Sequence, residues 1–119
     1  MANILIIDDE APSRRFVGRA LQKQGHSVYE AADGAEGLRL MAVQPIDLVI
    51  TDLLMPGTDG IETIVEIRRS YANVKIIAIS GGGGFGTNFL HAAQLLGADN
   101  IFQKPFEFSR LIPEIQRLL

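Results

Sequence analysis

The segment ILIIDDE, residues 4–10, joins four apolar residues directly to three acids. A short apolar run rich in Ile and Val is typical of a parallel strand that is covered on both faces. The same pattern recurs at 48–50, 76–79 and 101–102, and the alternating segment 27–31 predicts an edge strand with one wetter face. The sequence therefore predicts five strands.

A helix-length segment follows each of these strands. The first, residues 11–24, is predicted to bury Phe16, Ala20 and Leu21 on one face. It is followed by Gly25, a residue that commonly terminates helices.

Two of the other helices carry capping signals. Asp33 and Asp59 are each followed three residues later by Glu, which predicts an N-cap Asp at the start of the second and third helices. The fourth and fifth helices are predicted over residues 87–96 and 107–119. Pro113 disturbs the last helix, because proline is tolerated only in the first turn. We expect Ser109 as its N-cap, with a late start or a kink.

The predicted elements alternate strand and helix five times. Repeated βα units imply a parallel sheet with helices on both faces. We therefore expect an α/β fold, a doubly wound (βα)5 arrangement in three α/β/α layers. The length of 119 residues predicts a single domain over residues 1–119.

Composition excludes several classes of protein. Hydrophobic residues make up 47% and charged residues 21%, as in an ordinary globular domain. The absence of Cys excludes disulfides, thiolate zinc sites and cysteine nucleophiles. A formal charge of −3 argues against a surface that coats nucleic acid. The longest apolar runs fall far short of the roughly 20 residues of a membrane helix, so we expect a cytoplasmic protein.

Polar side chains gather at the predicted carboxyl ends of the strands. These ends carry Asp8, Asp9, Asp52, Ser80 and Lys104. In open α/β sheets, ligands bind at this edge. Three carboxylates in one cleft repel one another unless a cation joins them. No arginine follows them closely in sequence, so we expect a hard divalent ion such as Mg²⁺.

The same residues suggest phosphoryl transfer. Such catalysis depends mainly on positioning and on charge neutralisation. Lys104 would contribute a positive charge and Ser80 a hydroxyl donor. With no Cys and no suitable Ser–His pair, a carboxylate is the best candidate nucleophile.

These positions also carry a family resemblance. Asp8-Asp9, the run from Asp52 to Gly60, Ser80 and Lys104-Pro105-Phe106 resemble the signature of bacterial two-component response regulator receiver domains. The resemblance covers the whole chain. It implies a flavodoxin-like (CheY-like) fold whose five parallel strands have the order 2-1-3-4-5. It also implies a signalling phosphoprotein, not a turnover enzyme, although the domain would catalyse its own Mg²⁺-dependent phosphorylation and dephosphorylation.

The resemblance assigns a role to each matching residue. Asp52 would accept a phosphoryl group, as an aspartyl phosphate, from a sensor histidine kinase or a histidine phosphotransfer protein. Asp9 and Asp52 would ligate Mg²⁺ or Mn²⁺ directly, Asp8 through water, and Leu54 through its backbone carbonyl. The remaining roles concern Ser80, which would bond a phosphoryl oxygen, Lys104, which would pair with the phosphoryl group, and Pro105, which would follow a cis peptide bond.

The sequence departs from the family pattern at three places. Ile101 stands where the family usually has an aromatic switch residue, and Phe102 is predicted to face the other side of the sheet. Leu54 places no polar side chain two residues after the acceptor. Four consecutive glycines follow Ser80, namely Gly81, Gly82, Gly83 and Gly84.

We therefore expect an order–disorder switch over residues 81–88 in place of an aromatic rotamer switch. An unidentified downstream protein would read the face built from the fourth helix, the fifth strand and the fifth helix. The expected state is a monomer or a weak dimer, without direct contact to nucleic acid or membrane. Residues 1–119 contain no expected output domain, so the chain is either a stand-alone regulator or part of a longer one.

Two other functions would require residues that this sequence lacks. A phosphate-binding loop would need Lys where Thr87 stands, and an aspartate-nucleophile phosphatase would need Asp where Glu10 stands. The alternative that stays open is a receiver-like interaction module that works without phosphorylation.

Overall fold

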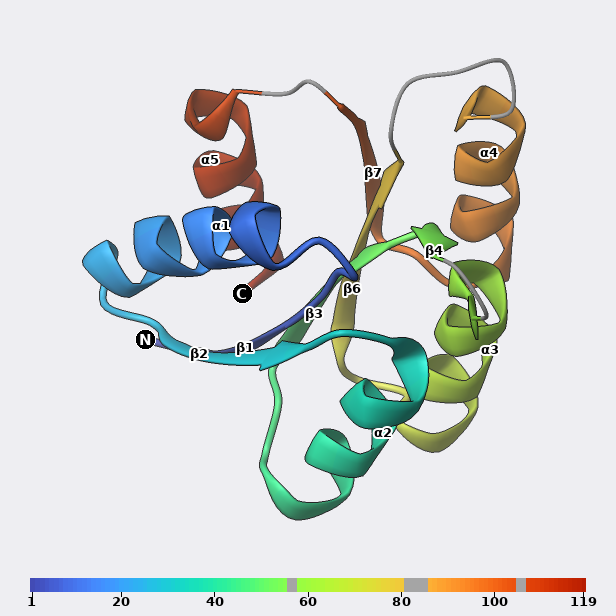
Figure 1. The fold of residues 1–119 in the computed structure, drawn as a ribbon, viewed down its shortest axis with the longest axis horizontal. Helices are drawn as coiled ribbons and strands as arrows, with labels where there is room; N and C mark the ends of the chain where they lie inside the picture. The colour runs from blue at the N-terminus through green and yellow to red at the C-terminus, as the bar shows by residue number, and fades with distance from the viewer. Residues whose placement is uncertain (56–57, 81–85, 105–106) are drawn as a thin grey trace.

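The structure is a computed structural model that describes residues 1–55, 58–80, 86–104 and 107–119. Strands and helices alternate along the chain as the sequence predicts, apart from two additional short strands before the third helix (Figure 1). The elements are β1 (Asn3–Ile7), α1 (Ala11–Lys23), β2 (Ser27–Ala31), α2 (Gly34–Val43), β3 (Leu48–Asp52), β4 (Leu54–Met55), β5 (Thr58–Asp59), α3 (Gly60–Ser70), β6 (Lys75–Ser80), α4 (Gly86–Leu96), β7 (Asn100–Gln103) and α5 (Phe108–Leu118).

The main sheet has five parallel strands in the order β2-β1-β3-β6-β7. Strands β4 and β5 form a separate antiparallel pair of two residues each, which no pattern in the sequence predicts. With that pair set aside, the order is 2-1-3-4-5. The doubly wound α/β fold is therefore confirmed.

The helices cover both faces of the sheet. Helices α1 and α5 lie on one face, and α2, α3 and α4 lie on the other (Figure 1). Strand β3 is buried along its whole length, as a central strand with two covered faces requires. Strand β2 has a partly exposed pattern and lies at the edge, which confirms the prediction for 27–31.

The cap of α2 confirms one capping prediction. The Asp33 carboxylate accepts a hydrogen bond of 2.8 Å from the Glu36 backbone N–H. The Glu36 carboxylate in turn accepts one of 3.3 Å from the backbone N–H of Ala32. The side chain of Asp59 lies outside the part of the chain whose side chains the structure describes, so the second cap stays a prediction.

The prediction of a buried Phe16 is wrong. Phe16 is 66% exposed, and α1 instead buries Val17, Gly18 and Leu21. Gly18 explains this rotation, because a Cβ there would lie only 3.3 Å from Val28 on β2. The helix therefore turns its glycine to the sheet and its phenylalanine outward. The Phe16 ring packs at 5.2 Å from the ring of Phe108 at the start of α5.

The prediction of a late start for α5 is also wrong. The helix begins at Phe108 with Glu107 at the N-cap, and the Ser109 hydroxyl donates to the Glu107 carboxylate. Pro113 lies inside the helix, which continues to Leu118. Full burial of Leu111 and Ile115 against the sheet stabilises the helix despite the N–H that proline lacks.

Candidate phosphoacceptor site

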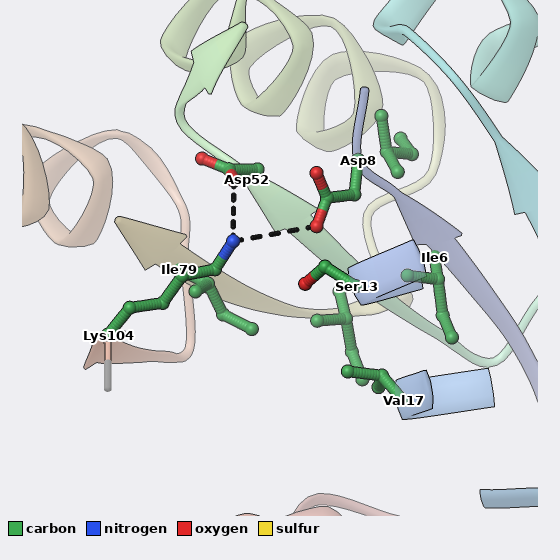
Figure 2. A pocket seen from close by; sticks show the side chains of 9 residues that line it. Ile6, Asp8, Ser13, Val17, Asp52, Ile79 and Lys104 are labelled. Atoms are coloured by element: carbon green, nitrogen blue, oxygen red, sulfur yellow. Dashed lines mark hydrogen bonds and ion pairs between the residues drawn. The ribbon is translucent and has the colours of Figure 1, made fainter. Parts of the chain in front are cut away.

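The carboxyl ends of three strands bring two acids and a lysine together. Asp8 follows β1, Asp52 ends β3 and Lys104 follows β7. The Lys104 ammonium lies 3.1 Å from Asp52 Oδ2 and 3.5 Å from Asp8 Oδ2 (Figure 2). The structure thus joins residues that are 44 and 52 positions apart in the sequence, as their places at the strand ends predict.

Asp9 completes a cluster of three carboxylates. One oxygen each of Asp8, Asp9 and Asp52 lies within 4.8 Å of the others. Asp8 and Asp52 are buried at 6% exposure each, whereas Asp9 is exposed. Oxygen donors at this spacing suit a hard cation such as Mg²⁺, which keeps several waters and needs few protein ligands. The donor set therefore fits a divalent ion at the open side of the cluster.

The backbone around Asp8 is held by several groups. Its N–H donates to the Ala31 carbonyl at 3.0 Å, and its carboxylate accepts from the Glu10 N–H at 3.0 Å. Its carbonyl accepts a hydrogen bond of 2.6 Å from Arg14. No arginine is expected here from the sequence. The missed signal is helical geometry, since side chains in the first turn of α1 lean back toward the preceding strand end.

The backbone around Asp52 is packed against the start of α3. The N–H of Leu53 donates to the Ile79 carbonyl at 2.9 Å, which extends the sheet past the end of β3. A Cβ at Gly60 would lie 2.5 Å from the Leu53 Cα and 2.7 Å from the Asp52 carbonyl oxygen. Glycine at position 60 therefore lets α3 begin directly beside the residue that carries the central carboxylate.

Lys104 is tied to the neighbouring strand and to the acids. Its backbone N–H donates to the Ser80 carbonyl at 2.7 Å. Burial by itself lowers the pKa of the Lys104 ammonium, but the hydrogen bond and charge of Asp52, with the charges of Asp8 and Glu10, outweigh burial and raise that pKa. Lys104 is therefore a cation throughout the physiological range.

A small cavity lies beneath the charged groups. Its volume is ≈30 Å³, with Asp8, Asp52, Lys104 and Ser13 at its polar end and Ile and Val side chains around the rest (Figure 2). A cavity of this size holds about one or two water molecules.

The other predicted site residues are placed as follows. Ser80 ends β6 and is fully buried. Ile101 packs against the core beneath α2, α3 and α4, whereas Phe102 packs against the core on the opposite face, as predicted. Leu54 lies in β4, and nothing of its side chain is described. Five predicted site residues lie outside the described part of the chain, namely Gly81, Gly82, Gly83, Gly84 and Pro105.

Residues 4–116 match the family model of the response regulator receiver domain. The chain belongs to this family. Its solved structures include the response regulator TrrA of Thermotoga maritima in complex with Mg(2+)-BeF, which matches this receiver domain with a TM-score of 0.86 and 32% identity over the full length of both chains.

Curated relatives of the receiver domain differ in length. Sporulation initiation phosphotransferase F of Bacillus subtilis is 28% identical over 98% of this chain and 92% of its own length. The sensor kinase CckA of Brucella abortus is 32% identical over 99% of this chain, but the match spans only 12% of that protein. The receiver domain is thus nearly the whole of one relative and a small part of another.

Among the helices that the structure describes, none combines the length and the apolar character needed to cross a bilayer.

Proposed function

We propose that Asp52 accepts a phosphoryl group in a Mg²⁺-dependent reaction and thereby switches the domain between signalling states. The observation that carries this proposal is the Lys104 ammonium, 3.1 Å from Asp52, beside three carboxylates whose oxygens lie within 4.8 Å of one another. Asp52 ends the central strand, and Lys104 contacts both Asp52 and Asp8, so a group bound to Asp52 would lie beside this cation and beside the acid cluster (Figure 2).

The transfer step follows from these positions. An Asp52 carboxylate oxygen attacks phosphorus as the bond from phosphorus to the donor nitrogen breaks, and the nitrogen keeps the electron pair of that bond. Lys104 pairs with a phosphoryl oxygen, and the Ser80 hydroxyl binds another. Asp9 and Asp52 would hold the ion directly, Asp8 through water, and Leu54 through its carbonyl. When bound, Mg²⁺ neutralises developing charge on the phosphoryl oxygens.

We further propose that the donor is a sensor histidine kinase or a histidine phosphotransfer protein in the cytoplasm. The domain would act as a monomer or a weak dimer, as a phosphoacceptor without turnover of an external substrate, and without direct contact to nucleic acid. A downstream protein would bind the face of α4, β7 and α5. In support, α4 contains no charged residue and exposes Leu95 at 87% and Leu96 at 46%.

A receiver-like module that works without phosphorylation is not favoured, because the acids and Lys104 are assembled as a phosphoacceptor requires. Titration with beryllofluoride, a phosphoryl mimic, separates the two functions. Backbone amide NMR signals of residues 52–53, 80 and 104 should shift with beryllofluoride and Mg²⁺ together and stay unchanged with beryllofluoride and EDTA. Absence of shifts in both samples would contradict the proposal.

A further inference from the structure

We propose that Arg14 is a positioning residue for the metal site, where it sets the direction of the Asp9 carboxylate through the backbone. The inference rests on the proposed function, because it assigns Arg14 a role in binding the ion that phosphorylation requires. The roles predicted from the sequence include none for Arg14. In the described part of the chain, Arg14 makes no hydrogen bond to Asp52 or to Lys104.

The guanidinium of Arg14 connects two strands at the edge of the site. Its Nη1 donates to the Asp8 carbonyl at 2.6 Å, and its Nε donates to Glu30 Oε1 at 2.8 Å. The Arg14 side chain is only 14% exposed. A planar guanidinium held at two edges cannot rotate without breaking one of these bonds. The carbonyl of Asp8 is therefore fixed in direction.

The fixed carbonyl of Asp8 determines the position of the Asp9 backbone. The carbonyl of Asp8 and the N and Cα of Asp9 belong to one planar peptide unit. The Asp9 side chain is exposed and makes no hydrogen bond or ion pair to any residue in the described ranges. Its direction thus depends on its backbone, and the backbone depends on Arg14. Asp8 has its own bond to the Glu10 N–H and is less dependent on Arg14.

Glu30 and Gly18 complete the arrangement. Glu30 on β2 holds Nε, which aims Nη1 at the Asp8 carbonyl. A Cβ at Gly18 would lie 3.9 Å from Glu30 Oε2 and 3.3 Å from Val28. The glycine on α1 thus leaves space for the ion pair between the helix and the edge strand.

If Arg14 positions Asp9, its replacement should change the affinity for the ion in the direction opposite to that expected from charge alone. Removal of a positive charge near a cation site lowers repulsion and should tighten binding of the ion. Loss of a group that orients a metal ligand weakens binding, commonly about tenfold or more. We therefore expect Arg14→Gln to raise the Kd for Mn²⁺ about tenfold, measured by electron paramagnetic resonance of free Mn²⁺ in place of the spectroscopically silent Mg²⁺.

Three further variants distinguish the positioning role of Arg14 from the effect of its charge and from a loss of folding. Arg14→Lys keeps the charge but not the planar fork, so it should also weaken Mn²⁺ binding. Glu30→Gln should weaken it less, and this variant tests the inference even if Arg14→Gln does not fold. Arg15→Gln removes an exposed neighbouring charge and should leave the Kd unchanged or lower it slightly. Circular dichroism checks that each variant is folded at the temperature of the titration.

A double-mutant cycle tests the route through Asp9. Asp9→Ala should raise the Kd for Mn²⁺ strongly in the wild-type background and weakly beside Arg14→Gln. Equal effects in the two backgrounds, or Mn²⁺ binding by Arg14→Gln as tight as that of wild type, would overturn the inference and leave the proposed function intact. A wild-type domain that binds no Mn²⁺ would overturn the proposed function and the inference with it.

Discussion

The two ends of the parallel sheet use ionisable side chains in opposite ways. At the amino end, the residue just before a strand accepts a hydrogen bond with its side chain. The donor is a backbone N–H in the neighbouring strand, or in the residue just before that neighbouring strand. Asp47 accepts from Asn3 at 2.8 Å, Asp99 accepts from Ile76 at 2.8 Å, and His26 accepts from Ala2 at 3.2 Å. These side chains complete the hydrogen bonding of the sheet, and they are part of its stability.

At the carboxyl end, the charged side chains face one another. Asp8, Asp9 and Asp52 carry three negative charges with oxygens within 4.8 Å, and Lys104 brings one positive charge to them. Like charges at this distance oppose folding unless a cation joins them. We therefore expect the amino end of the sheet to stabilise the fold and the acid cluster at the carboxyl end to lower its stability.

The largest expected effect on stability lies at the amino end, at Arg68. Its guanidinium donates to the carbonyls of Ala72, Val74 and Gly97 and to Asp99, at distances of 2.7 to 3.0 Å. Arg68→Met leaves these acceptors without their donor and should lower the free energy of unfolding by about 2–3 kcal/mol. Urea denaturation measures this change.

Arg69→Met is the matched control for Arg68. Arg69 is 69% exposed and pairs with Glu66 on the surface of α3. Exposed pairs of this kind contribute little, so the free energy of unfolding should change by less than about 0.5 kcal/mol. Equal losses in the two variants would show that the Arg68 contacts do not close the amino end of the sheet.

Replacement of Asp by Asn should change the free energy of unfolding in opposite directions at the two ends of the sheet. Unit charges 4.8 Å apart repel by about 3 kcal/mol at an effective dielectric of 20. Asp8→Asn removes such repulsion but weakens the contact with Lys104, so it should raise the free energy of unfolding in EDTA by about 1 kcal/mol. Asp47→Asn weakens the bond to Asn3 and should lower it by about 1 kcal/mol.

With saturating Mg²⁺, the wild type should have a higher free energy of unfolding than Asp8→Asn, the reverse of the order expected in EDTA. An ion that binds only the folded state stabilises it more when it binds more tightly. Mg²⁺ should therefore raise the free energy of unfolding more for the wild type than for Asp8→Asn. Destabilisation by Asp8→Asn in EDTA, equal to that by Asp47→Asn, would mean that the acid cluster is not under electrostatic strain.

The smallest expected effect concerns His26. Burial, followed by the charge of the N-terminal ammonium, lowers the pKa of His26 below its ordinary value of 6.5. The unfolded chain then binds the proton more readily, so the contribution is present above pH 6.5 and is lost as the pH falls through the folded-state pKa. The free energy of unfolding of wild type should fall slightly more than that of His26→Asn between pH 7.5 and pH 5.5. Identical pH profiles would exclude a role for this histidine.

Much of the fold and of the site could be predicted because both depend on patterns along the chain. Apolar runs mark the buried strands, and residues that directly follow such runs meet at one edge of a parallel sheet. Asp8, Asp52 and Lys104 could therefore be brought together from sequence. The wet edge strand and the Asp33 cap also follow from local patterns.

The features that could not be predicted depend on packing between elements. The rotation of α1 that exposes Phe16 follows from the contact between Gly18 and β2, which no helical pattern contains. The start of α5 at Phe108 depends on burial of Leu111 and Ile115, which overrides the cost of Pro113. The contact of Arg14 with the Asp8 carbonyl joins a helix to a strand end, and only the assembled sheet places Glu30 beside it.

The central claim is that the carboxyl end of the sheet is a Mg²⁺-dependent phosphoacceptor site centred on Asp52. Intact-mass spectrometry after incubation with acetyl phosphate tests it most directly, with borohydride reduction to locate the modified residue. We predict one added phosphoryl group on wild type and on Asp47→Asn with Mg²⁺, located at Asp52, and none with EDTA or on Asp52→Asn. Phosphorylation of Asp52→Asn at the wild-type level, or equal phosphorylation of wild type in EDTA, would contradict the account.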